Sequence, residues 1–506
     1  MTENSSINKK IMRIFKKIQI SVPLFLIITG AFILRLATLS KLMVFTPDEE
    51  YILYITQTLV KHLHIIWIGV SALGFDFYMG PGLNYFLVPF IWAFKGDPII
   101  WGIVTSILGI ATCFLVYWIG GKLFSQKTGL IAAIIYGFSA LLIYYDQQPY
   151  PTGVPFLSIS MFISLYMTKY SKKWWILFSF LYGLVFHIHL SLVLIILIAI
   201  YWAITHRKTW DLKTLFFSLI AFLLVISPLI GFDYFHKFSN VTAPIRVVQA
   251  IGKSKNKFDL GNRLQALAKP ISRIWYLDIG KSNSDEILYP CNTVLGNNAT
   301  KIRWVIVLIL VILVLLFLLK KDVWKDQGKR LLLLFSIPFL IPFIFLSSIG
   351  SVEYYLLGFF PIFILIIAYG ITHLPKGLRF FSYVILFIFV IYNIATVFSA
   401  SGSYGLITKK KIIKDVMGAI GDSTYSLSET GGPCQGNAGW GYLFSVFGRR
   451  PDNNIADKQF SWLLPIGNMS KTKYRVLINE TRFSVEVSGY KYKLIEGGFT
   501  SYIFSN

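Results

Sequence analysis

Apolar segments of about 20 residues recur along this chain from residue 19 to residue 400. The hydrocarbon core of a bilayer is about 30 Å thick, and a helix needs about 20 mostly apolar residues to cross it. The chain is 55% hydrophobic and only 14% charged, whereas soluble domains carry about 25% charged residues. The sequence therefore predicts an all-α polytopic membrane protein and excludes an ordinary soluble domain.

About eleven transmembrane helices can be placed within residues 19–400. The candidate spans are 19–39, 99–119, 128–145, 150–168, 173–189, 190–205, 212–231, 303–319, 331–349, 353–372 and 378–399. The first apolar run is too long for the core of a signal peptide, and no small-residue cleavage site follows it. We therefore expect a retained first helix behind a cytoplasmic N-terminus at 1–18.

Basic residues gather in the short loops between these spans. If the N-terminus is cytoplasmic, every basic short loop falls on the cytoplasmic side, as the positive-inside rule requires. These loops carry Lys122, Lys127, Lys169, Lys172, Lys173, Arg207, Lys208, Lys320, Lys321, Lys325, Lys329, Arg330, Lys376 and Arg379. Much of the net charge of +24 thus sets orientation, and we expect no nucleic-acid partner. The same alternation requires the short apolar segment 83–94 to lie in the interface rather than cross.

Three regions then lie outside the membrane: loop 40–98, loop 233–302 and the C-terminal region 401–506. In the last, Ile412, Ile413, Val416, Met417 and Ile420 form one helical face, and 474–478 and 483–487 resemble strands. This pattern predicts a small α/β extracytoplasmic C-terminal domain. Cys291 and Cys434 both fall outside, where a disulfide can persist. A bridge and two free thiols are equally compatible with the sequence, and Cys113 lies in a span.

The segment Thr46–Tyr51 directly follows the first span. Thr46 and Glu49 form a capping box, and Pro47 occupies the favoured first helical position. The segment therefore predicts the start of a helix that lies on the membrane surface. The acids of this segment either only cap the helix or serve chemistry. In the second case the helix dipole keeps Asp48 ionised, so that it can act as a general base or as a metal ligand.

Further polar residues stand where the spans meet the outside. Asp146 is either an exposed turn residue or a second acid that shares a cleft with Asp48. His187 and His189 are two residues apart, so they cannot both point the same way from a helix, and we expect at most one of them in a site. Candidates for lipid-phosphate contacts follow the seventh span, and an interfacial Tyr pair opens the tenth; the residues concerned are Asp233, His236, Arg246, Arg273, Glu353, Tyr354 and Tyr355.

Several short motifs occur in a recognisable order. Arg35 closes the first span, Asp48-Glu49 begins the first outer loop, the segment Gly80–Tyr85 follows in that loop, and Asp146 opens the next outer region. The stretches 183–189, 232–236 and 355–361 continue the series. In this order the chain resembles the GT-C superfamily of integral-membrane glycosyltransferases. The resemblance is to its glycosyltransferase-family-39-like group, which contains protein O-mannosyltransferases, the aminoarabinose transferase of lipid A and bacterial Rgt-type transferases. A departure is Pro81-Gly82, where the family often has two prolines.

The resemblance implies a GT-C-like catalytic domain over 19–400 that takes a sugar from a polyprenyl-phosphate donor. The acceptor would be a glycolipid, a cell-surface glycan or a protein, and the anomeric centre would invert. The implied catalytic residues are Asp48, as the base, with Glu49 and Asp146; the implied substrate-binding residues are Arg35, Tyr85, His189, Asp233, His236, Arg246 and Tyr355. Metal dependence varies within the family, so the resemblance leaves a divalent metal ion open.

Other membrane proteins share some of these features. A transporter or flippase of lipid-linked saccharides would carry ionisable residues at mid-membrane, whereas the acids here are expected at the outer surface. A polymerase or ligase of glycans would use a lipid pyrophosphate carrier instead. We expect a multi-pass protein of a plasma membrane, in contact with membrane lipids, with its active site and C-terminus extracytoplasmic.

Overall fold

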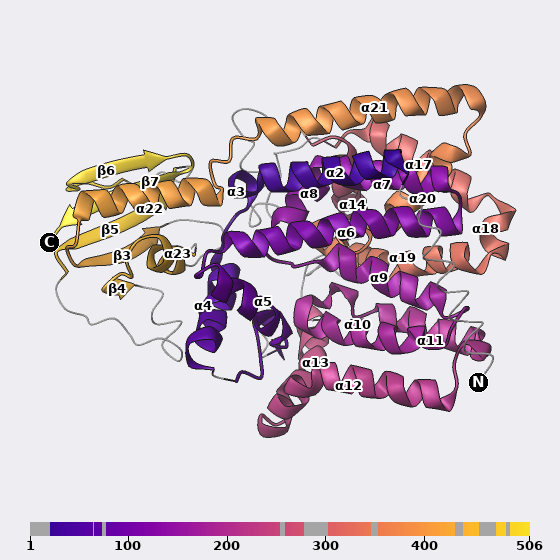
Figure 1. Ribbon diagram of the computed structural model, residues 1–506, viewed down its shortest axis with the longest axis horizontal. Coiled ribbons are helices and arrows are strands. Elements are labelled where there is room, and N and C mark those ends of the chain that lie inside the picture. Colours follow the sequence, from indigo (N-terminus) through magenta and orange to yellow (C-terminus); the bar gives the residue numbers. More distant parts are fainter. Residues whose placement is uncertain are drawn as a thin grey trace.

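The computed structural model describes residues 21–63, 65–72, 77–252, 259–277, 302–345, 353–430, 439–454, 472–481 and 486–506. A bundle of roughly parallel helices makes up its larger part, and a small α/β domain adjoins one end of the bundle (Figure 1). The expected mostly helical architecture with a small sheet is thus confirmed. Cys291 and Cys434 lie outside the described residues, so their bridge stays a hypothesis.

The bundle helices overlap each of the apolar segments expected to span. They are α2 (Val22–Ala37), α6 (Ile99–Leu123), α7 (Gln126–Phe138), α8 (Ala140–Gln147), α9 (Val154–Met167), α10 (Trp174–Ile188), α11 (Ile195–Thr205), α12 (Leu212–Phe235), α17 (Trp304–Leu318), α19 (Gln327–Phe345), α20 (Phe360–Thr372) and α21 (Lys376–Ser399). Short elements link them: η1 (Leu190–Leu192), η2 (Arg207–Thr209), α18 (Lys321–Lys325) and η3 (Glu353–Leu356).

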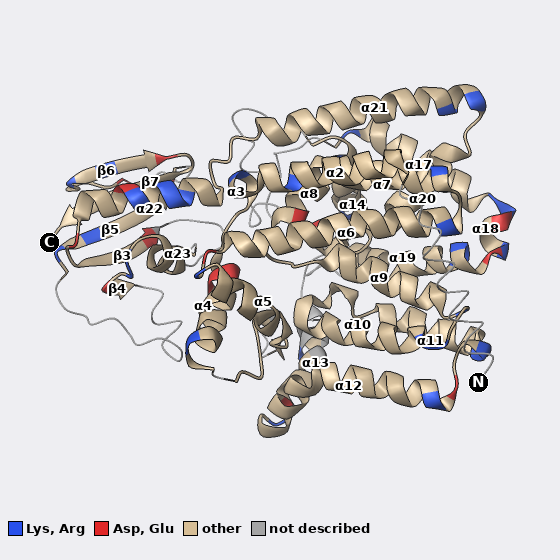
Figure 2. Ribbon diagram, in the orientation of Figure 1, with Lys and Arg blue, Asp and Glu red and all other residues tan. Residues whose placement is uncertain are grey.

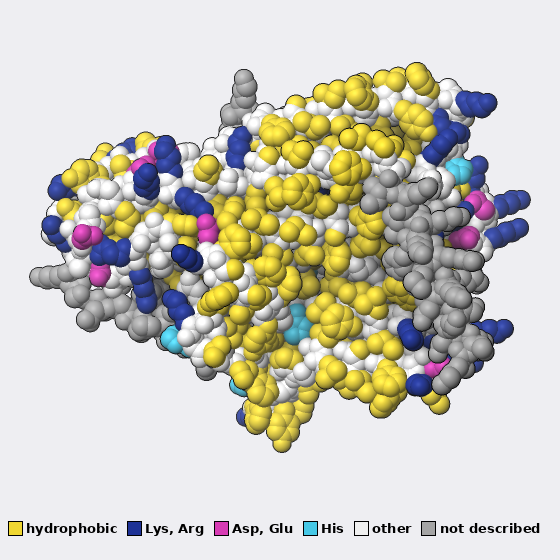
Figure 3. Space-filling view, viewed as in Figure 1, with side chains coloured by type: hydrophobic (Ala, Val, Ile, Leu, Met, Phe, Trp, Pro, Cys, Tyr) yellow, Lys and Arg dark blue, Asp and Glu magenta, His cyan; other side chains and the backbone are white. Residues whose placement is uncertain are grey.

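Among the described residues, 4 helices are long and apolar enough to cross a membrane: α6, α12, α19 and α21. The number is 5 if α7 and α8, which meet at a bend of 63°, count as one span. The other expected spans correspond to shorter apolar helices, so a total of eleven stays a prediction. Apolar side chains form a broad band over the bundle, and charged side chains gather at its two ends (Figure 3), as expected of a bundle in a bilayer.

The two ends of the bundle differ in charge. The loops expected to be cytoplasmic lie together at the end that carries α18, where Lys and Arg gather (Figure 2). The expected first outer loop and the α/β domain lie at the opposite end. The fold therefore places the basic short loops on one side, as the positive-inside pattern predicted.

The first outer loop forms its own small structure at that opposite end. It consists of α3 (Leu39–Leu42), α4 (Pro47–His62), the hairpin β1 (Ser71–Ala72) and β2 (Phe77–Tyr78), and α5 (Gly82–Ala93). Helices α4 and α5 pack on each other and run at a steep angle to bundle helices such as α6 (Figure 1). With 12 residues, α5 is too short to span a bilayer, as its expected interfacial position requires. The second outer loop provides α13 (Ser239–Gly252) and α14 (Leu260–Trp275).

The α/β domain contains α22 (Leu406–Ile420), α23 (Trp440–Phe447) and a five-stranded sheet of order β4-β3-β5-β7-β6. Its strands are β3 (Tyr425–Thr430), β4 (Asn453–Asn454), β5 (Tyr474–Glu480), β6 (Tyr492–Glu496) and β7 (Phe499–Ser505). Strands β4, β3 and β5 are parallel, and β7 is antiparallel to both β5 and β6. The expected α22 face is buried at Ile412, Ile413, Val416 and Ile420. The expected strand 483–487 lies mostly outside the described residues, and its described part is not a strand.

Candidate functional site

The acidic segment of the first outer loop opens α4. The backbone N–H of Thr46 donates to Oε2 of Glu49 at 2.7 Å, and the Thr46 hydroxyl donates to the same oxygen. Both halves of the expected capping box are present, and Pro47 begins the helix. Glu49 is buried, whereas Asp48, one residue earlier, is exposed. The capping geometry thus turns Glu49 into the protein and leaves Asp48 accessible.

The carboxyl groups of Glu49 and Asp48 both have raised pKa values. Burial, and then the charge of Asp48, raise the pKa of Glu49 to about 7. Although Asp48 keeps accessible surface, protein surrounds it on most sides, and this desolvation raises its pKa as well. A carboxylate with a raised pKa accepts a proton more readily than an ordinary one. Asp48 therefore has the accessibility and the basicity of a general base.

An aromatic cluster lies near Asp48. The charge of Asp48 acts on the hydroxyls of Tyr150 and Tyr354. The ring of His189 lies 6.0 Å from that of Tyr150 and 5.6 Å from those of both Tyr354 and Tyr355, measured between centroids. These residues come from the α8–α9 loop, the end of α10 and η3. Three distant chain segments thus form one aromatic wall near Asp48, and Tyr150 is a member that sequence reasoning missed.

A buried ion pair lies next to this wall. Nη1 of Arg273 on α14 donates to Oε2 of Glu353 at 2.9 Å, and the Tyr145 hydroxyl donates to Oε1 at 2.8 Å. Half-buried Lys269, one turn earlier on α14, interacts electrostatically with both members of the pair. Tyr144 interacts with Glu49 as well as with Arg273 and Glu353. The acidic segment and the α14 cations therefore border one region, which we call the α4–α14 site.

Lys269 and Glu353 were not expected to lie here. The sequence indicates Glu353 only by its position at the start of an expected span, and it gives no motif that singles out Lys269. Helix α14 is strongly amphipathic, with Ala268, Ser272 and Arg273 among its buried residues. That amphipathic pattern was the signal that could have placed its cations against the bundle.

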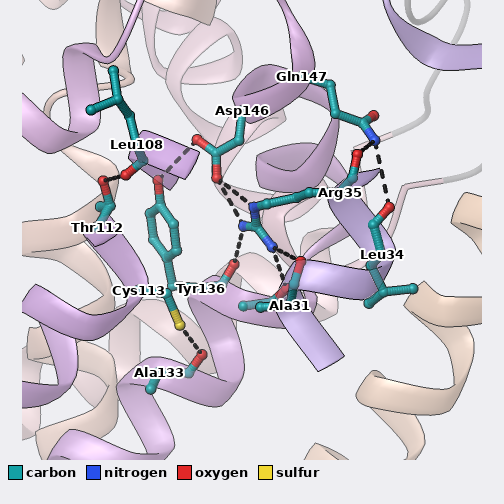
Figure 4. Close-up of polar contacts among 11 residues, drawn as sticks. Ala31, Leu34, Arg35, Leu108, Thr112, Cys113, Ala133, Tyr136, Asp146 and Gln147 are labelled. Carbon is teal, nitrogen blue, oxygen red and sulfur yellow. Dashed lines mark hydrogen bonds and ion pairs between the residues drawn. The ribbon is translucent and has the colours of Figure 1, made fainter. Parts of the chain in front are cut away.

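Arg35 and Asp146 form a second buried ion pair, inside the bundle (Figure 4). Nε and Nη2 of Arg35 donate to Oδ2 of Asp146 at 3.0 and 2.8 Å, and the Tyr136 hydroxyl donates to Oδ1 at 3.1 Å. Nη1 of Arg35 also donates to the carbonyl of Gly137 at 2.9 Å. These bonds occupy the guanidinium and cross the α7–α8 bend, where carbonyls leave the helical ladder.

The expected position of Asp146 in an outer loop is wrong. Asp146 lies in α8, and its side chain is 5% exposed, while that of Arg35 is 0% exposed. The expectation failed because Arg35 lies 111 residues away in sequence, so no local pattern reveals the pairing. Both residues here hold α2 against the α7–α8 bend, and the structure shows neither of them open to a substrate.

Close packing against His187 explains why the segment Gly80–Tyr85 contains glycines. The His187 ring lies so close to Gly80 and Gly82 that a Cβ on either would collide with it, at 2.2 and 2.8 Å. Nδ1 of His187 accepts the backbone N–H of Gly82 at 2.9 Å, and Nε2 donates to the carbonyl of Val225 at 2.8 Å. His187 therefore fastens the first outer loop, while His189 joins the wall of the α4–α14 site.

Tyr85 acts nearby as a second fastener. Its hydroxyl donates to the carbonyl of Ile66 at 2.8 Å and accepts the Ile66 N–H at 3.0 Å. These two bonds hold the chain between α4 and the β1–β2 hairpin.

The residues expected at the start of the second outer loop serve α12 and α13. Oδ1 of Asp233 accepts the N–H of Asn240 at 2.9 Å, and His236 stacks on Phe232 with centroids 4.0 Å apart. Nη1 of Arg246 donates to the Thr242 hydroxyl at 2.8 Å, and Nη2 to the carbonyl of Ser239 at 3.0 Å. These contacts hold the three residues within the α12–α13 corner.

The α/β domain packs directly behind the acidic segment. Oε1 of Glu50 accepts the backbone N–H of Tyr442 at 2.7 Å, and Lys409 of α22 donates to the carbonyl of Phe45 at 2.8 Å. Lys409 is fully buried, near Glu50, Glu429 and Glu480. Desolvation lowers its pKa to about 8. One apolar core joins the segment Met43–Phe45 with α22 and α23. The domain thus supports the chain that carries Asp48.

The described ranges contain no group of three or more His, Cys, Asp or Glu side chains placed to hold a metal ion.

Comparisons with known proteins bear on the fold. A sequence profile described as dolichyl-phosphate-mannose-protein mannosyltransferase matches residues 81–232. A search of curated protein sequences finds no match. The crystal structure of ArnT from Cupriavidus metallidurans in the apo state aligns with a TM-score of 0.56 at 9% identity, covering 95% of this chain and 97% of that one.

A second ArnT structure, bound to undecaprenyl phosphate, aligns with the same coverage and a TM-score of 0.55 at 9% identity. The oligosaccharyltransferase of Archaeoglobus fulgidus aligns with a TM-score of 0.48 at 12% identity, covering 91% of this chain and 68% of that one. The chain has a GT-C-like fold, and the resemblance to the GT-C superfamily of membrane glycosyltransferases that its motifs indicated is confirmed.

Proposed function

We propose that this protein transfers a sugar from a polyprenyl-phosphate carrier to an acceptor hydroxyl at the outer face of a plasma membrane. The observation that carries the proposal is Asp48, an accessible carboxylate with a raised pKa at the start of α4. It lies near a wall of Tyr and His side chains, at the bundle end opposite the basic loops. The acceptor is a glycolipid, a cell-surface glycan or a protein.

The reaction is a single displacement at the anomeric carbon. The acceptor oxygen forms a bond to that carbon while the bond from the carbon to the phosphate oxygen breaks, and the anomeric centre inverts. The acceptor proton passes to Asp48, and the carrier leaves as polyprenyl phosphate. The transition state has oxocarbenium character, as in other glycosyl transfers. Phosphate is already a good leaving group, so the chain needs one base and cations for the phosphate.

We assign the phosphate to the α14 cations. Arg273 and Lys269 lie one turn apart on α14 and both interact with Glu353, whereas Arg246 bonds within α13. Cations that stabilise charge developing on the departing phosphate lower the barrier directly. Glu353 orients Arg273 through their 2.9 Å bond. His189, Tyr150 and Tyr355 then line the sugar side of the α4–α14 site.

The comparisons support this donor class. The profile that matches residues 81–232 describes transferases that use dolichyl-phosphate-mannose, and a similarly folded ArnT binds undecaprenyl phosphate. The low identity of the ArnT match makes the donor a proposal for this chain.

The test uses purified full-length protein in lipid nanodiscs, supplied with polyprenyl-phosphate sugars of several kinds and a mixture of acceptors. Release of free polyprenyl phosphate is followed by mass spectrometry. Release that falls strongly in Asp48→Asn, and persists in the exposed-acid control Asp422→Asn, supports the proposal. No release from any polyprenyl-phosphate donor by folded wild-type protein rejects it, in favour of a transporter, or of a polymerase or ligase with a pyrophosphate-linked donor.

A further inference from the structure

The end of the bundle away from Asp48 contains a pocket that the proposed function does not use. Its volume is about 260 Å³, and it lies between α6, α7, α19, α20 and α21. Three cations line it: Lys127 of α7, Lys329 of α19 and Arg379 of α21. The hydroxyl groups of Ser125, Tyr369, Thr372 and Tyr383 and the imidazole of His373 complete the polar lining.

The cations of this pocket outnumber the acids that pair with them, so the pocket is positively charged. Nζ of Lys329 forms an ion pair with Oδ2 of Asp322 at 2.5 Å, which offsets one cation. Within the described part of the chain, Lys127 has no ion pair or hydrogen bond. Arg379 donates Nε and Nη2 to the carbonyl of Leu374 at 3.2 and 2.8 Å, so its Nη1 group is left for a ligand. Two cations from different helices thus line one pocket.

The backbone around the pocket also carries partial positive charge. All three cations lie in the first turn of their helices, because α7 begins at Gln126, α19 at Gln327 and α21 at Lys376. Helix N-termini carry partial positive charge and favour anions. Positive-inside loops explain why cations stand at this end, but that rule does not explain their convergence from three helices on one pocket with hydroxyl donors.

The first turns of α21 also carry exposed apolar side chains. Beside Arg379, the side chains of Leu378, Phe380 and Phe381 on α21 are 57%, 72% and 61% exposed. A ligand whose phosphate enters the pocket can therefore continue along α21 with apolar chains. Basic pockets between membrane helices are suited to lipid headgroups for this reason.

We propose that this pocket binds the phosphate group of an anionic phospholipid. Arg379 and Lys127 contact the phosphate oxygens, Lys329 remains paired with Asp322 at the rim, and the acyl chains lie against α21. The site is separate from the α4–α14 site, so it stands or falls independently of the transferase reaction.

The test compares two double variants with the same loss of charge. Lys127→Gln/Arg379→Gln removes both pocket cations and leaves the Lys329–Asp322 pair intact. Lys122→Gln/Lys376→Gln removes two exposed cations from the same end outside the pocket. Each protein is purified and titrated with phosphatidylglycerol in phosphatidylcholine nanodiscs, and bound phosphatidylglycerol is counted by native mass spectrometry. Soluble glycerol 3-phosphate is titrated in a parallel arm.

Each cation near a phosphate contributes roughly fivefold to affinity. We therefore expect phosphatidylglycerol binding to weaken roughly twentyfold in the pocket variant and to change little in the control variant. If the wild type binds glycerol 3-phosphate but not phosphatidylglycerol, and the pocket variant loses this binding, the phosphate contacts are supported. The ligand is then a soluble phosphate, and the lipid part of the proposal is overturned. Equal binding by the two double variants, or no binding of either ligand by the wild type, would overturn the proposal. The single variant Lys127→Gln, with an expected loss of roughly fivefold, serves if the double variant does not fold.

Discussion

Asp48 and Asp146 look alike in the sequence, each an acid just outside an expected span, but the structure places them in opposite environments. Asp48 lies in the first turn of α4, keeps accessible area and lies near an aromatic wall. Asp146 lies inside the bundle, where Arg35 and Tyr136 occupy both of its oxygens. A buried carboxylate needs such partners because removing it from water is costly. An accessible carboxylate beside a wall of side chains is instead available to a substrate.

The comparison predicts the largest loss of activity at Asp48. We expect Asp48→Asn to lower the rate of sugar transfer by roughly 10²- to 10⁴-fold, because the amide cannot accept the acceptor proton. Thermal unfolding should change little, since Glu49 and not Asp48 caps α4. Steady-state carrier release and a thermal melt in the same nanodiscs measure both effects. Transfer that survives at the wild-type rate would remove Asp48 as the base.

The comparison predicts the largest loss of stability at the Arg35–Asp146 pair. Removing one partner leaves a buried charge without compensation, which costs about 3–5 kcal/mol. We therefore expect Asp146→Asn and Arg35→Met each to lower the midpoint of thermal unfolding markedly. The double variant Arg35→Met/Asp146→Leu should lose less than the sum of the two single variants, because no charge remains. Strict additivity would show that the two residues do not act as a pair.

Because the α/β domain packs behind the segment that carries Asp48, we expect a variant in that domain to affect both stability and sugar transfer. Lys409→Met removes the cation from the cluster of Glu50, Glu429 and Glu480, and we expect a loss of about 3 kcal/mol together with reduced transfer. The exposed Lys414→Met on the same helix is the matched control. Lower turnover at an unchanged melting midpoint would also assign Lys409 to positioning of Asp48. Wild-type behaviour in both measurements would show that the α/β domain does not support the acidic segment.

The smallest predicted effect is a pH dependence at Glu49. Its pKa is raised from the ordinary value of 4.5 to about 7 in the folded protein. Between these values the folded state holds a proton that the unfolded state has lost, so stability falls as pH rises from about 4.5 to about 7. We expect this loss to be roughly 1–3 kcal/mol.

The variant Glu49→Gln isolates this contribution. Its amide oxygen can still accept the Thr46 N–H, but it does not titrate. Thermal melts between pH 4 and pH 8 should therefore lose most of this slope in the variant. An unchanged slope would place its origin in another group.

The local features of this fold were predictable from sequence, and the non-local ones were not. The capping box of Thr46 and Glu49 and the buried face of α22 follow from residues within a few positions of each other, and the structure has both. The partner of Asp146 lies 111 residues away, and that of Glu353 lies 80 residues away on α14. Periodicity and spacing carry no information about such pairings. Arg35 likewise bonds to Gly137 of α7 and Asp146 of α8 across the bend between these helices, more than 100 residues from its own position.

The most direct test of this account compares Asp48→Asn with Asp146→Asn at equal amounts of folded protein. Both variants are purified in lipid nanodiscs, the folded fraction is determined by thermal melt, and release of polyprenyl phosphate is measured per folded molecule. The account predicts that Asp48→Asn melts like the wild type and transfers roughly 10²- to 10⁴-fold more slowly. Asp146→Asn should melt earlier and retain most of its transfer rate per folded molecule. The reverse pattern, with Asp146 essential for transfer and Asp48 dispensable, would contradict it.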